Sequence, residues 1–518
     1  MKFIDRLKNF KFIDDDRDIF ENSQIFAGYI EQKGIKEVEI HLSGAFEFCV
    51  AFFGSMMATA KPYLLAKPIF SGERAYVNDE NFAKFLEHKN ICDKELSLES
   101  KFYLKTSGST GKSKDVEKSL QDMVVEGEYL SSKFGFSAQN IFFSSVSHQH
   151  MFGLAYRVFL PMMVGAKAFS KELNYPEAIF NLNLANHIFI TSPVLLRMLV
   201  QSPRAKEIKD LAAIVSAGSE LKSELRERIK ELCDARIIDI YGSTETGTIA
   251  WNLGGGLMLF DAVSAGFDQR EALNIRSPWC EFFQSNDWAQ VQDSRLILKG
   301  RLDRVVKLND KRISLDELDK RLCSSGILSD CYCGIHPKFS RLTALIELNE
   351  AGLAKFRQGG KSAIVKELKE ILKPDFKNVL RHFKIMEKLP RNPQGKFLKS
   401  EFENALFKDS SPVWVKEQSD TWQYKFSAVM SVELEIFTHH FYKLPLLPGF
   451  FQLDFVYELA KSVGIEFKDS IIVENLKFTK FVQPNDKLSV CFEKRREKLH
   501  FEIFCNGERC SCGRIGPI

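Results

Sequence analysis

The sequence has no long hydrophobic run and little net charge. No apolar stretch in its 518 residues approaches the roughly 18 residues of a membrane span. The first 20 residues carry five aspartates and no continuous apolar segment, so we expect no secretory signal. The 72 basic residues nearly balance the 68 acidic ones, leaving a net charge of +4 that does not indicate a nucleic-acid partner. These absences predict a cytoplasmic protein with no membrane span.

The cysteines also exclude two kinds of structure. Eleven of them are scattered along the chain, an odd number that fits reduced thiols better than a disulfide framework. Cys331 and Cys333 near His336, and Cys510 with Cys512, lack the C-x₂₋₄-C spacing of a zinc site. The first of these groups lies in an apolar segment typical of a strand. We therefore predict no metal site at these cysteines.

The order of apolar runs predicts several domains. From about residue 35 to 300, short strand-like runs alternate with helical patterns, which favours an α/β fold with largely parallel sheets. A charged helix at residues 315–322 belongs to a smaller α+β unit, and the last hundred residues read as strand, helix and several strands. The predicted organisation is a large domain at 1–299, a small domain at 300–408, a linker at 409–418 and a C-terminal domain at 419–518.

Residues 106–114 form the segment richest in phosphate-binding side chains, Thr-Ser-Gly-Ser-Thr-Gly-Lys-Ser-Lys. Glycines let backbone N–H groups approach anionic oxygens, hydroxyls donate hydrogen bonds and lysines add positive charge. A Walker A loop would need glycine where the chain has Thr106. The segment is similar to the [ST]-S-G-[ST]-T-G-x-P-K loop of adenylate-forming ligases, with Ser113 in place of the proline.

Further segments are similar to motifs of the same ligase superfamily, in the same order. They are residues 216–221 (family G-G-A-P-L), 241–246 (Y-G-x-T-E), 286–287 (T-G-D), 300–307 with 312–313 (G-R-x-D-x-x-x-K…R-I) and 390–396 (P-R-[TN]-x-x-G-K). Asn286 stands where the family has glycine, and the stretch from Glu245 to Asp287 is short for the family. Over residues 102–396 the chain resembles an AMP-forming acyl ligase.

The resemblance implies ATP and Mg²⁺ as cofactors. The implied nucleotide contacts are Thr106, Ser107, Gly108, Ser109, Thr110, Gly111 and Lys114 for the β- and γ-phosphates, Gly218, Ser219, Glu220 and Tyr241 for adenine, and Asp287 and Arg301 for ribose. Thr244 would donate to the α-phosphate and Glu245 would bind Mg²⁺. Lys396 would bridge the substrate carboxylate and the α-phosphate.

The same resemblance implies a second step at a moved small domain. Asp303 matches the hinge, and Lys307 matches a lysine that faces the site in the second conformation. His150 resembles the histidine of an H-x-x-G-L segment that lines the acyl pocket. The substrate would be a fatty or aryl carboxylic acid, and the acceptor thiol would belong to CoA or to the phosphopantetheine of an acyl carrier protein.

The C-terminal segment resembles a different family. Residues 440–449 are similar to the H-F-P-G-x-P-x-x-P-G signature of hot-dog 3-hydroxyacyl-carrier-protein dehydratases, with Tyr442 and Lys443 replacing Pro-Gly. Residues 449–464 read as a helix that is apolar on most faces and is expected to be buried. Strands at 471–481, 487–494 and 498–505 would wrap this helix.

The dehydratase resemblance also implies roles for three residues. His440 would be the general base, and Asp454, fourteen positions later, would handle the departing hydroxyl. The helix N-terminus at Gly449 would donate N–H groups to the thioester carbonyl. In that family the histidine and the acid come from different protomers, which implies a homodimer.

The sequence therefore predicts a bifunctional enzyme of acyl metabolism. One half would activate an acid with ATP and pass it to a thiol, and the other would dehydrate a 3-hydroxyacyl thioester, as in fatty-acid-like or aryl-polyene-like biosynthesis. Three alternatives stay open. They are an active ligase whose degenerate hot-dog domain only dimerises or binds acyl chains, a non-catalytic acyl- and nucleotide-binding scaffold, and a P-loop NTPase.

Overall fold

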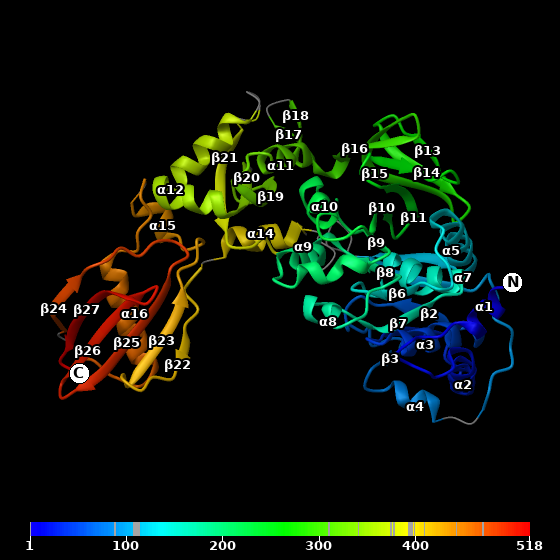
Figure 1. Ribbon diagram of the computed structural model, residues 1–518, viewed down its shortest axis with the longest axis horizontal. Coiled ribbons are helices and arrows are strands. Elements are labelled where there is room, and N and C mark those ends of the chain that lie inside the picture. The colour runs from blue at the N-terminus through cyan, green and yellow to red at the C-terminus, as the bar shows by residue number, and fades with distance from the viewer. Residues whose placement is uncertain are drawn as a thin grey trace. The chain divides into compact units, whose positions relative to one another are not determined.

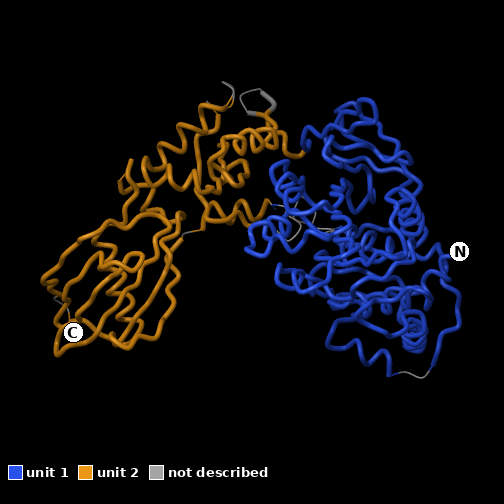
Figure 2. Tube along the Cα trace, viewed as in Figure 1, with its two compact units in different colours: residues 1–302, 391–398 blue, residues 303–390, 399–518 orange. Residues whose placement is uncertain are grey.

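The computed structural model describes residues 2–87, 90–106, 114–308, 311–339, 341–372, 376, 379–391, 397, 399–408, 410–441, 443–468 and 471–518. The chain forms two units: unit 1 is Met1–Leu302 with Arg391–Leu398, and unit 2 is Asp303–Pro390 with Lys399–Ile518 (Figure 2). The units divide between Leu302 and Asp303, which is the residue predicted as a hinge.

Unit 1 contains a five-stranded sheet with the order β3-β1-β2-β4-β5 (Figure 1). Its first four strands run parallel and β5 pairs antiparallel to β4. Helix α3 (Ala45–Met57) is buried at every residue except Glu47, because its phenylalanines give it apolar side chains all round. The strands are β1 (Glu37–His41), β2 (Lys61–Leu64), β3 (Ala75–Asn78), β4 (Lys101–Thr106) and β5 (Lys114–Ser119).

A second sheet of unit 1 has eleven strands, with the order β13-β14-β15-β16-β12-β11-β10-β9-β8-β6-β7. Its parallel part is β6 (Ile141–Ser144), β7 (Lys167–Glu172), β8 (His187–Thr191), β9 (Ala213–Ser216) and β10 (Arg236–Ser243). Its antiparallel part is β11 (Gly247–Asn252), β12 (Leu257–Leu259), β13 (Ser264–Phe267), β14 (Ala272–Ser277), β15 (Cys280–Gln292) and β16 (Arg295–Arg301).

The prediction of largely parallel sheets up to residue 300 is therefore wrong beyond β10. Strands β11 to β16 follow one another without intervening helices, and such short connections join antiparallel neighbours. The other helices of unit 1 are α1 (Phe3–Asn9), α2 (Ile19–Gln32), α4 (Phe82–Leu86), α5 (Leu120–Phe134), α6 (Met151–Gly153), α7 (Leu160–Val164), α8 (Pro176–Phe180), α9 (Pro193–Gln201) and α10 (Ser223–Lys230). A π-helical segment (Leu154–Phe159) joins α6 to α7, and 3₁₀ turns lie at Ala205–Asp210 and, at the border of the units, Leu302–Arg304.

Unit 2 begins with a small α+β part. A hairpin of β17 (Val305–Leu308) and β18 (Lys311–Ser314) leads into α11 (Leu315–Cys323), as predicted for this helix. A three-stranded sheet follows, with β19 (Leu328–Ile335), β20 (Leu342–Leu348) and β21 (Leu380–Met386), and with helices α12 (Glu350–Glu370) and α14 (Lys399–Phe407). Cys331 and Cys333 lie in β19, so the strand predicted there is confirmed.

The rest of unit 2 is a six-stranded sheet with the order β22-β23-β25-β26-β27-β24 and helix α16 (Gly449–Ser462) against it (Figure 1). Its strands are β22 (Val415–Glu417), β23 (Tyr424–Val429), β24 (Ile472–Phe478), β25 (Lys487–Arg495), β26 (Lys498–Cys505) and β27 (Glu508–Gly516). A short helix, α15 (Ile436–His439), precedes His440. The segment predicted as a linker, residues 409–418, contains strand β22. It forms a strand because its backbone pairs with β23.

The prediction that helix α16 is buried is wrong for most of its residues in the single chain. Only Gln452, Val456, Leu459 and Ala460 of α16 are buried, and Phe450 is 61% exposed. A sheet covers one face of a helix, so the opposite face stays open. No helix in the described ranges has the length and apolar character that crossing a membrane requires.

Candidate functional site

The motifs of the large domain follow neighbouring parallel strands. Strands β8, β9 and β10 run parallel and adjacent, so their carboxyl ends meet at one edge of the sheet. Residues 216–221 continue from β9, and residues 241–246 continue from the end of β10. Open α/β sheets bind ligands at this edge. The topology therefore brings two of the predicted nucleotide-binding segments together.

The segment after β9 rests on a buried aspartate. Gly218 has a φ of +95°, a conformation that favours glycine, and the backbone N of Leu221 donates to Asp239 Oδ2 at 3.4 Å. Asp239 is cross-strand neighbour to Ser216, and both are buried. Burial raises the pKa of the Asp239 carboxyl to about 6. Gly218 and Glu220 are exposed, with Ser219 half-buried between them, so all three are accessible to a ligand.

Three predicted nucleotide contacts touch one another. The Tyr241 hydroxyl donates to Asp287 Oδ2 at 2.5 Å, and Arg301 Nη1 donates to Asp287 Oδ1 at 3.3 Å. Asp287 and Arg301 are paired across β15 and β16, and the Asp287 backbone N donates to Ser285 Oγ at 3.0 Å. Burial and then the Asp287 charge raise the pKa of Tyr241 well above its usual value. The carboxylate predicted to hold ribose is thus oriented by a phenol and a guanidinium.

The Thr244-Glu245 turn is held from the other sheet. Thr244 and Glu245 are half-buried between β10 and β11. Lys118 of β5, which is 5% exposed, donates from Nζ to the Glu245 carbonyl oxygen at 2.7 Å. Nothing in the sequence indicated this role for Lys118, because the charged residues in Asp-Val-Glu-Lys-Ser are typical of a solvent-exposed strand.

The ends of the predicted phosphate loop meet at a pair of strands. Thr106 ends β4, Lys114 begins β5, and the two residues are paired in the antiparallel register. Residues 107–113 and Lys396 lie outside the described residues. The predicted roles of Ser107, Gly108, Ser109, Thr110, Gly111 and Lys396 therefore stay predictions.

The residues predicted for the hinge and the acyl pocket lie in different elements. Asp303 lies in the 3₁₀ turn Leu302–Arg304 and is exposed, and the exposed Lys307 lies in β17. His150 is half-buried directly before α6. The fully buried histidine of that segment is His148, whose Nε2 lies 2.9 Å from the Leu42 carbonyl oxygen. Burial lowers the pKa of His148 well below its usual value, so it is neutral.

The residues predicted for dehydration lie at two elements of unit 2. His440 is half-buried after α15, and its Nδ1 has no hydrogen-bond partner among the described residues. Asp454 lies on α16 and is exposed, and no hydrogen bond or ion pair joins it to His440 in the described chain. Gly449 opens α16, and a Cβ there would lie 2.4 Å from the Phe478 ring.

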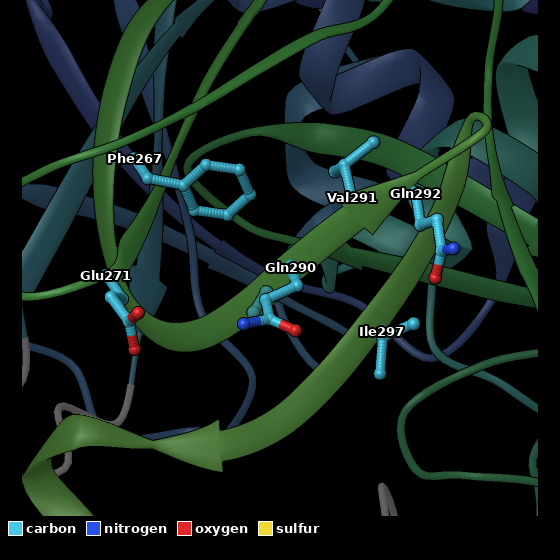
Figure 3. A pocket seen from close by; sticks show the side chains of 7 residues that line it. Phe267, Glu271, Gln290, Val291, Gln292 and Ile297 are labelled. Carbon is cyan, nitrogen blue, oxygen red and sulfur yellow. The ribbon is translucent and has the colours of Figure 1, made fainter.

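Unit 1 also contains a hollow of about 480 Å³ (Figure 3). It is lined from β13, β15 and β16, and by Glu271 before β14; the lining residues are Phe267, Glu271, Ala289, Gln290, Val291, Gln292 and Ile297. No residue predicted from the motifs lines it, so it supports no role in the predicted chemistry.

The side chains around Glu245 fit Mg²⁺ held mainly by a nucleotide. Within the described ranges, no group of three or more His, Cys, Asp or Glu residues could hold a metal ion. Mg²⁺ in phosphoryl sites commonly takes one or two carboxylates and fills its other positions with phosphate oxygens and water. A single carboxylate at Glu245 is compatible with that arrangement and with no protein cage.

Two family matches cover different parts of the chain. Residues 100–267 match the family described as AMP-binding enzyme, and residues 415–514 match the family described as ApeI dehydratase. Acetyl-coenzyme A synthetase 1 of Kluyveromyces lactis is 24% identical over 315 residues, which are 49% of this chain and 44% of that protein. Propionate--CoA ligase of Salmonella typhimurium is 28% identical over 163 residues, 29% of this chain and 26% of that protein. The chain spans about half the length of the acetyl-coenzyme A synthetases that it matches and about a quarter of the propionate--CoA ligase.

Solved structures share the fold at low identity. The ATP-bound RpMatB-BxBclM chimera B3 has a TM-score of 0.67 and 14% identity, covering 75% of this chain and 92% of its own. A benzoate CoA ligase from Burkholderia xenovorans has a TM-score of 0.65 and 17% identity, covering 77% and 97%. The predicted α/β ligase fold with a C-terminal hot-dog region is confirmed. The chain thus carries an AMP-binding domain with the fold of adenylate-forming ligases, followed by an ApeI-like dehydratase domain.

Proposed function

We propose that the chain activates a carboxylic acid as its adenylate and passes the acyl group to a thiol. The observation that carries this proposal is the Tyr241, Asp287 and Arg301 cluster at the edge where β9 and β10 end. A carboxylate oriented in this way suits the two hydroxyls of a ribose. The match of residues 100–267 to AMP-binding enzymes supports the same interpretation.

In the first step a carboxylate oxygen of the acid attacks the α-phosphorus of ATP and pyrophosphate leaves. The protein forms no covalent bond in this step, so its work is positioning and charge stabilisation. Thr244 would donate to the α-phosphate, and Lys396 would bridge the attacking carboxylate and that phosphate. Residues 106–114 would hold the departing β- and γ-phosphates. Mg²⁺, when bound by Glu245, supplies charge neutralisation for the triphosphate.

In the second step a thiol sulfur attacks the acyl carbon and AMP leaves. CoA and the phosphopantetheine arm of an acyl carrier protein present the same thiol chemistry. The relatives named acetyl-coenzyme A synthetase and propionate--CoA ligase favour CoA, and the attached dehydratase-like domain favours a carrier protein. Asp303 would act as the hinge, and Lys307 would face the site in this step.

Acid-dependent exchange of labelled pyrophosphate into ATP tests the ligase proposal. We expect exchange with a subset of fatty and aryl acids, and Lys396→Ala should abolish it because the bridging cation is lost. Lys399→Ala is the matched control, since the Lys399 side chain is 76% exposed. Unimpaired exchange in Lys396→Ala would contradict the assignment. ATP hydrolysis that needs no acid would favour an NTPase instead, and ATP binding without exchange would favour a scaffold.

We further propose that the C-terminal domain removes water from 3-hydroxyacyl thioesters. His440 would take a proton from Cα while Asp454 protonates the hydroxyl that leaves Cβ, so that a double bond and one water form. The α16 N-terminus at Gly449 would stabilise the enolate charge on the thioester oxygen. The match of residues 415–514 to ApeI dehydratase supports this second activity.

A homodimer through the hot-dog domain would complete the dehydratase site. Phe450 at the start of α16 is exposed, and so are Ile472 and Phe478 of the edge strand β24. Edge strands and open apolar faces are regular places of pairing between copies of a chain. A second protomer could then place its Asp454 beside the first protomer's His440.

Conversion of a 3-hydroxyacyl carrier protein to the enoyl form tests the second activity. We expect a rise in enoyl thioester absorbance that disappears in His440→Ala, because the general base is lost. His439→Ala is the matched control, since that neighbouring side chain is 70% exposed. If the wild-type chain forms no enoyl product at any chain length, the hot-dog domain only dimerises or binds acyl chains.

A further inference from the structure

A lysine outside the motif residues joins the two sheets of unit 1 beside the nucleotide site. Lys118 lies in β5, four residues after Lys114, in the five-stranded sheet. Its Nζ donates to the carbonyl oxygen of Glu245 at 2.7 Å and to that of Trp279 at 3.5 Å. Both acceptors belong to the part of the chain that forms the eleven-stranded sheet. The ammonium group therefore bridges the sheets at the predicted Mg²⁺ ligand.

The burial of Lys118 indicates that its charge has a use. Removing an ammonium group from water is costly unless acceptors and an opposite charge replace the water. Two carbonyl oxygens supply the acceptors. Burial raises the pKa of the fully buried Glu126, which accepts from the Thr248 backbone N at 2.7 Å, and the nearby Lys118 charge partly opposes that rise. An apolar side chain would fill the same space without this cost, so packing alone does not account for a lysine here.

The turn that Lys118 holds has its own internal bracing. The Ser243 backbone N donates to Thr246 Oγ1 at 3.1 Å, and the Thr246 backbone N donates to Ser243 Oγ at 3.2 Å. These bonds fix the shape of the turn between β10 and β11. They do not fix the distance between this turn and the five-stranded sheet. In the described chain, the hydrogen bond from Lys118 to the Glu245 carbonyl oxygen links the turn to that sheet.

One face of β5 carries both Lys118 and Lys114, the last residue of the phosphate-loop motif. Side chains two and four positions apart in a strand lie on the same face, so Lys114 and Lys118 share a face of β5. Lys114 is the last residue of the loop motif and pairs with Thr106 at the loop's other end. The strand that leaves the loop therefore also carries the anchor of the Glu245 turn.

We propose that Lys118 is a positioning residue for the metal–triphosphate end of the site. It ties the Glu245 turn to β5, the strand that begins at Lys114, and would so hold the Glu245 carboxylate in place for the Mg²⁺ that accompanies ATP. This inference rests on the proposed ligase function. It predicts that Lys118 affects the Mg²⁺-dependent part of ATP binding and leaves the metal-independent part unchanged.

Calorimetric titration of the full chain with ATP, in EDTA and in Mg²⁺, separates the two parts. We expect Lys118→Met to bind metal-free ATP like the wild type and to lose about tenfold to a hundredfold of the affinity that Mg²⁺ adds, which is the effect of losing a charged hydrogen bond. The Mg²⁺ concentration for half-maximal pyrophosphate exchange should rise by a similar factor. Lys101→Met is the matched control, because Lys101 lies in β4 on the surface and pairs with Glu117.

Two further variants keep the inference testable if Lys118→Met does not fold. Lys118→Arg retains the cation and should restore most of the Mg²⁺ effect, whereas a purely packing role would leave it as impaired as Lys118→Met. Thr246→Val loosens the same turn without touching Lys118 and should weaken the Mg²⁺-dependent binding in the same way.

Wild-type Mg²⁺ dependence in Lys118→Met would overturn the inference, and so would equal loss of ATP affinity in EDTA and in Mg²⁺. These outcomes are read from binding. Failure of the ligase proposal is distinct, because it would show as the absence of acid-dependent exchange in the wild-type chain.

Discussion

The nucleotide site of unit 1 and the dehydratase site of unit 2 are built in different ways. In unit 1, Asp287 contacts both Tyr241 and Arg301 although 46 residues separate it from the tyrosine, because strand pairing brings the three together. In unit 2, His440 and Asp454 are only fourteen positions apart in sequence and have no hydrogen bond or ion pair between them in the described chain. Closeness in sequence is therefore a poor guide to which of these sites one chain can assemble.

The difference follows from how much surface each part leaves open. The strands around Asp287 have neighbours on both sides within the eleven-stranded sheet. Strand β24 ends its sheet order, and Phe450, Ile472 and Phe481 nearby are each more than 60% exposed. An exposed apolar helix face and an edge strand favour pairing with a second copy of the same chain. The first site depends on the fold of one chain, and we propose that the second depends on two.

Mixing two inactive chains gives the largest expected effect on this comparison. His440→Ala and Asp454→Ala should each abolish enoyl formation alone. If each site takes its histidine and its acid from different protomers, co-refolded mixtures should recover about one quarter of wild-type activity, since about half of the dimers are mixed and one site in each is intact. Absence of recovery, with mixed dimers verified by mass spectrometry, would place both residues in one protomer's site or outside catalysis.

Removing the charge of Asp287 tests the site that one chain assembles. Asp287→Asn should lower kcat/KM for ATP in pyrophosphate exchange by about tenfold to a hundredfold, because charged hydrogen bonds are lost. The KM for the acid should change little, since the predicted contact is to ribose. Asp293→Asn is the matched control at the exposed turn between β15 and β16. Wild-type kcat/KM in Asp287→Asn would contradict the ribose assignment.

The motifs of the sequence predicted the fold class and named Tyr241, Asp287 and Arg301, which the structure brings together, but they did not predict the contacts among these three. Tyr241 was predicted for adenine and Asp287 for ribose, and the hydroxyl bond between them depends on a sheet register that neither motif encodes. The direction of β11 to β16 was also missed, because apolar periodicity indicates a strand and carries no sign of parallel or antiparallel pairing.

Two other features lay beyond sequence reasoning for different physical reasons. Lys118 bonds to a backbone carbonyl, and a carbonyl acceptor leaves no mark on residue types. The apolar pattern of α16 correctly predicted a helix, but the pattern is the same whether a sheet or a second copy of the chain covers each face. Hydrophobicity thus predicts that a face will be covered and does not identify what covers it.

The buried Asp239 beneath residues 217–221 gives a pH-dependent test of unit 1. Burial raises the pKa of its carboxyl from 3.8 to about 6, so the folded chain binds the proton more tightly than the unfolded chain. The free energy of unfolding therefore falls as pH rises from about 4 to about 6, and it stays lower by the same amount above that range. Asp239→Asn, which cannot ionise, should be more stable than wild type by up to about 3 kcal/mol near pH 8 and about equal near pH 4.

Urea denaturation at both pH values measures this effect. Asp234→Asn, at an exposed carboxylate just before β10, should show no such difference. A stabilisation by Asp239→Asn that is the same near pH 4 and near pH 8 would mean that the titration of this carboxyl is not its cause.

The smallest expected effect separates the ring of Tyr241 from its hydroxyl. Tyr241→Phe keeps an aromatic face for adenine and removes the hydroxyl that donates to Asp287 at 2.5 Å. Because Arg301 still holds the carboxylate, kcat/KM for ATP should fall only about threefold to tenfold, the range for one hydrogen bond. The double variant with Asp287→Asn should be no worse than Asp287→Asn alone, since the hydroxyl acts through that carboxylate. Additive losses in the double variant would instead mean that the hydroxyl contacts the nucleotide directly.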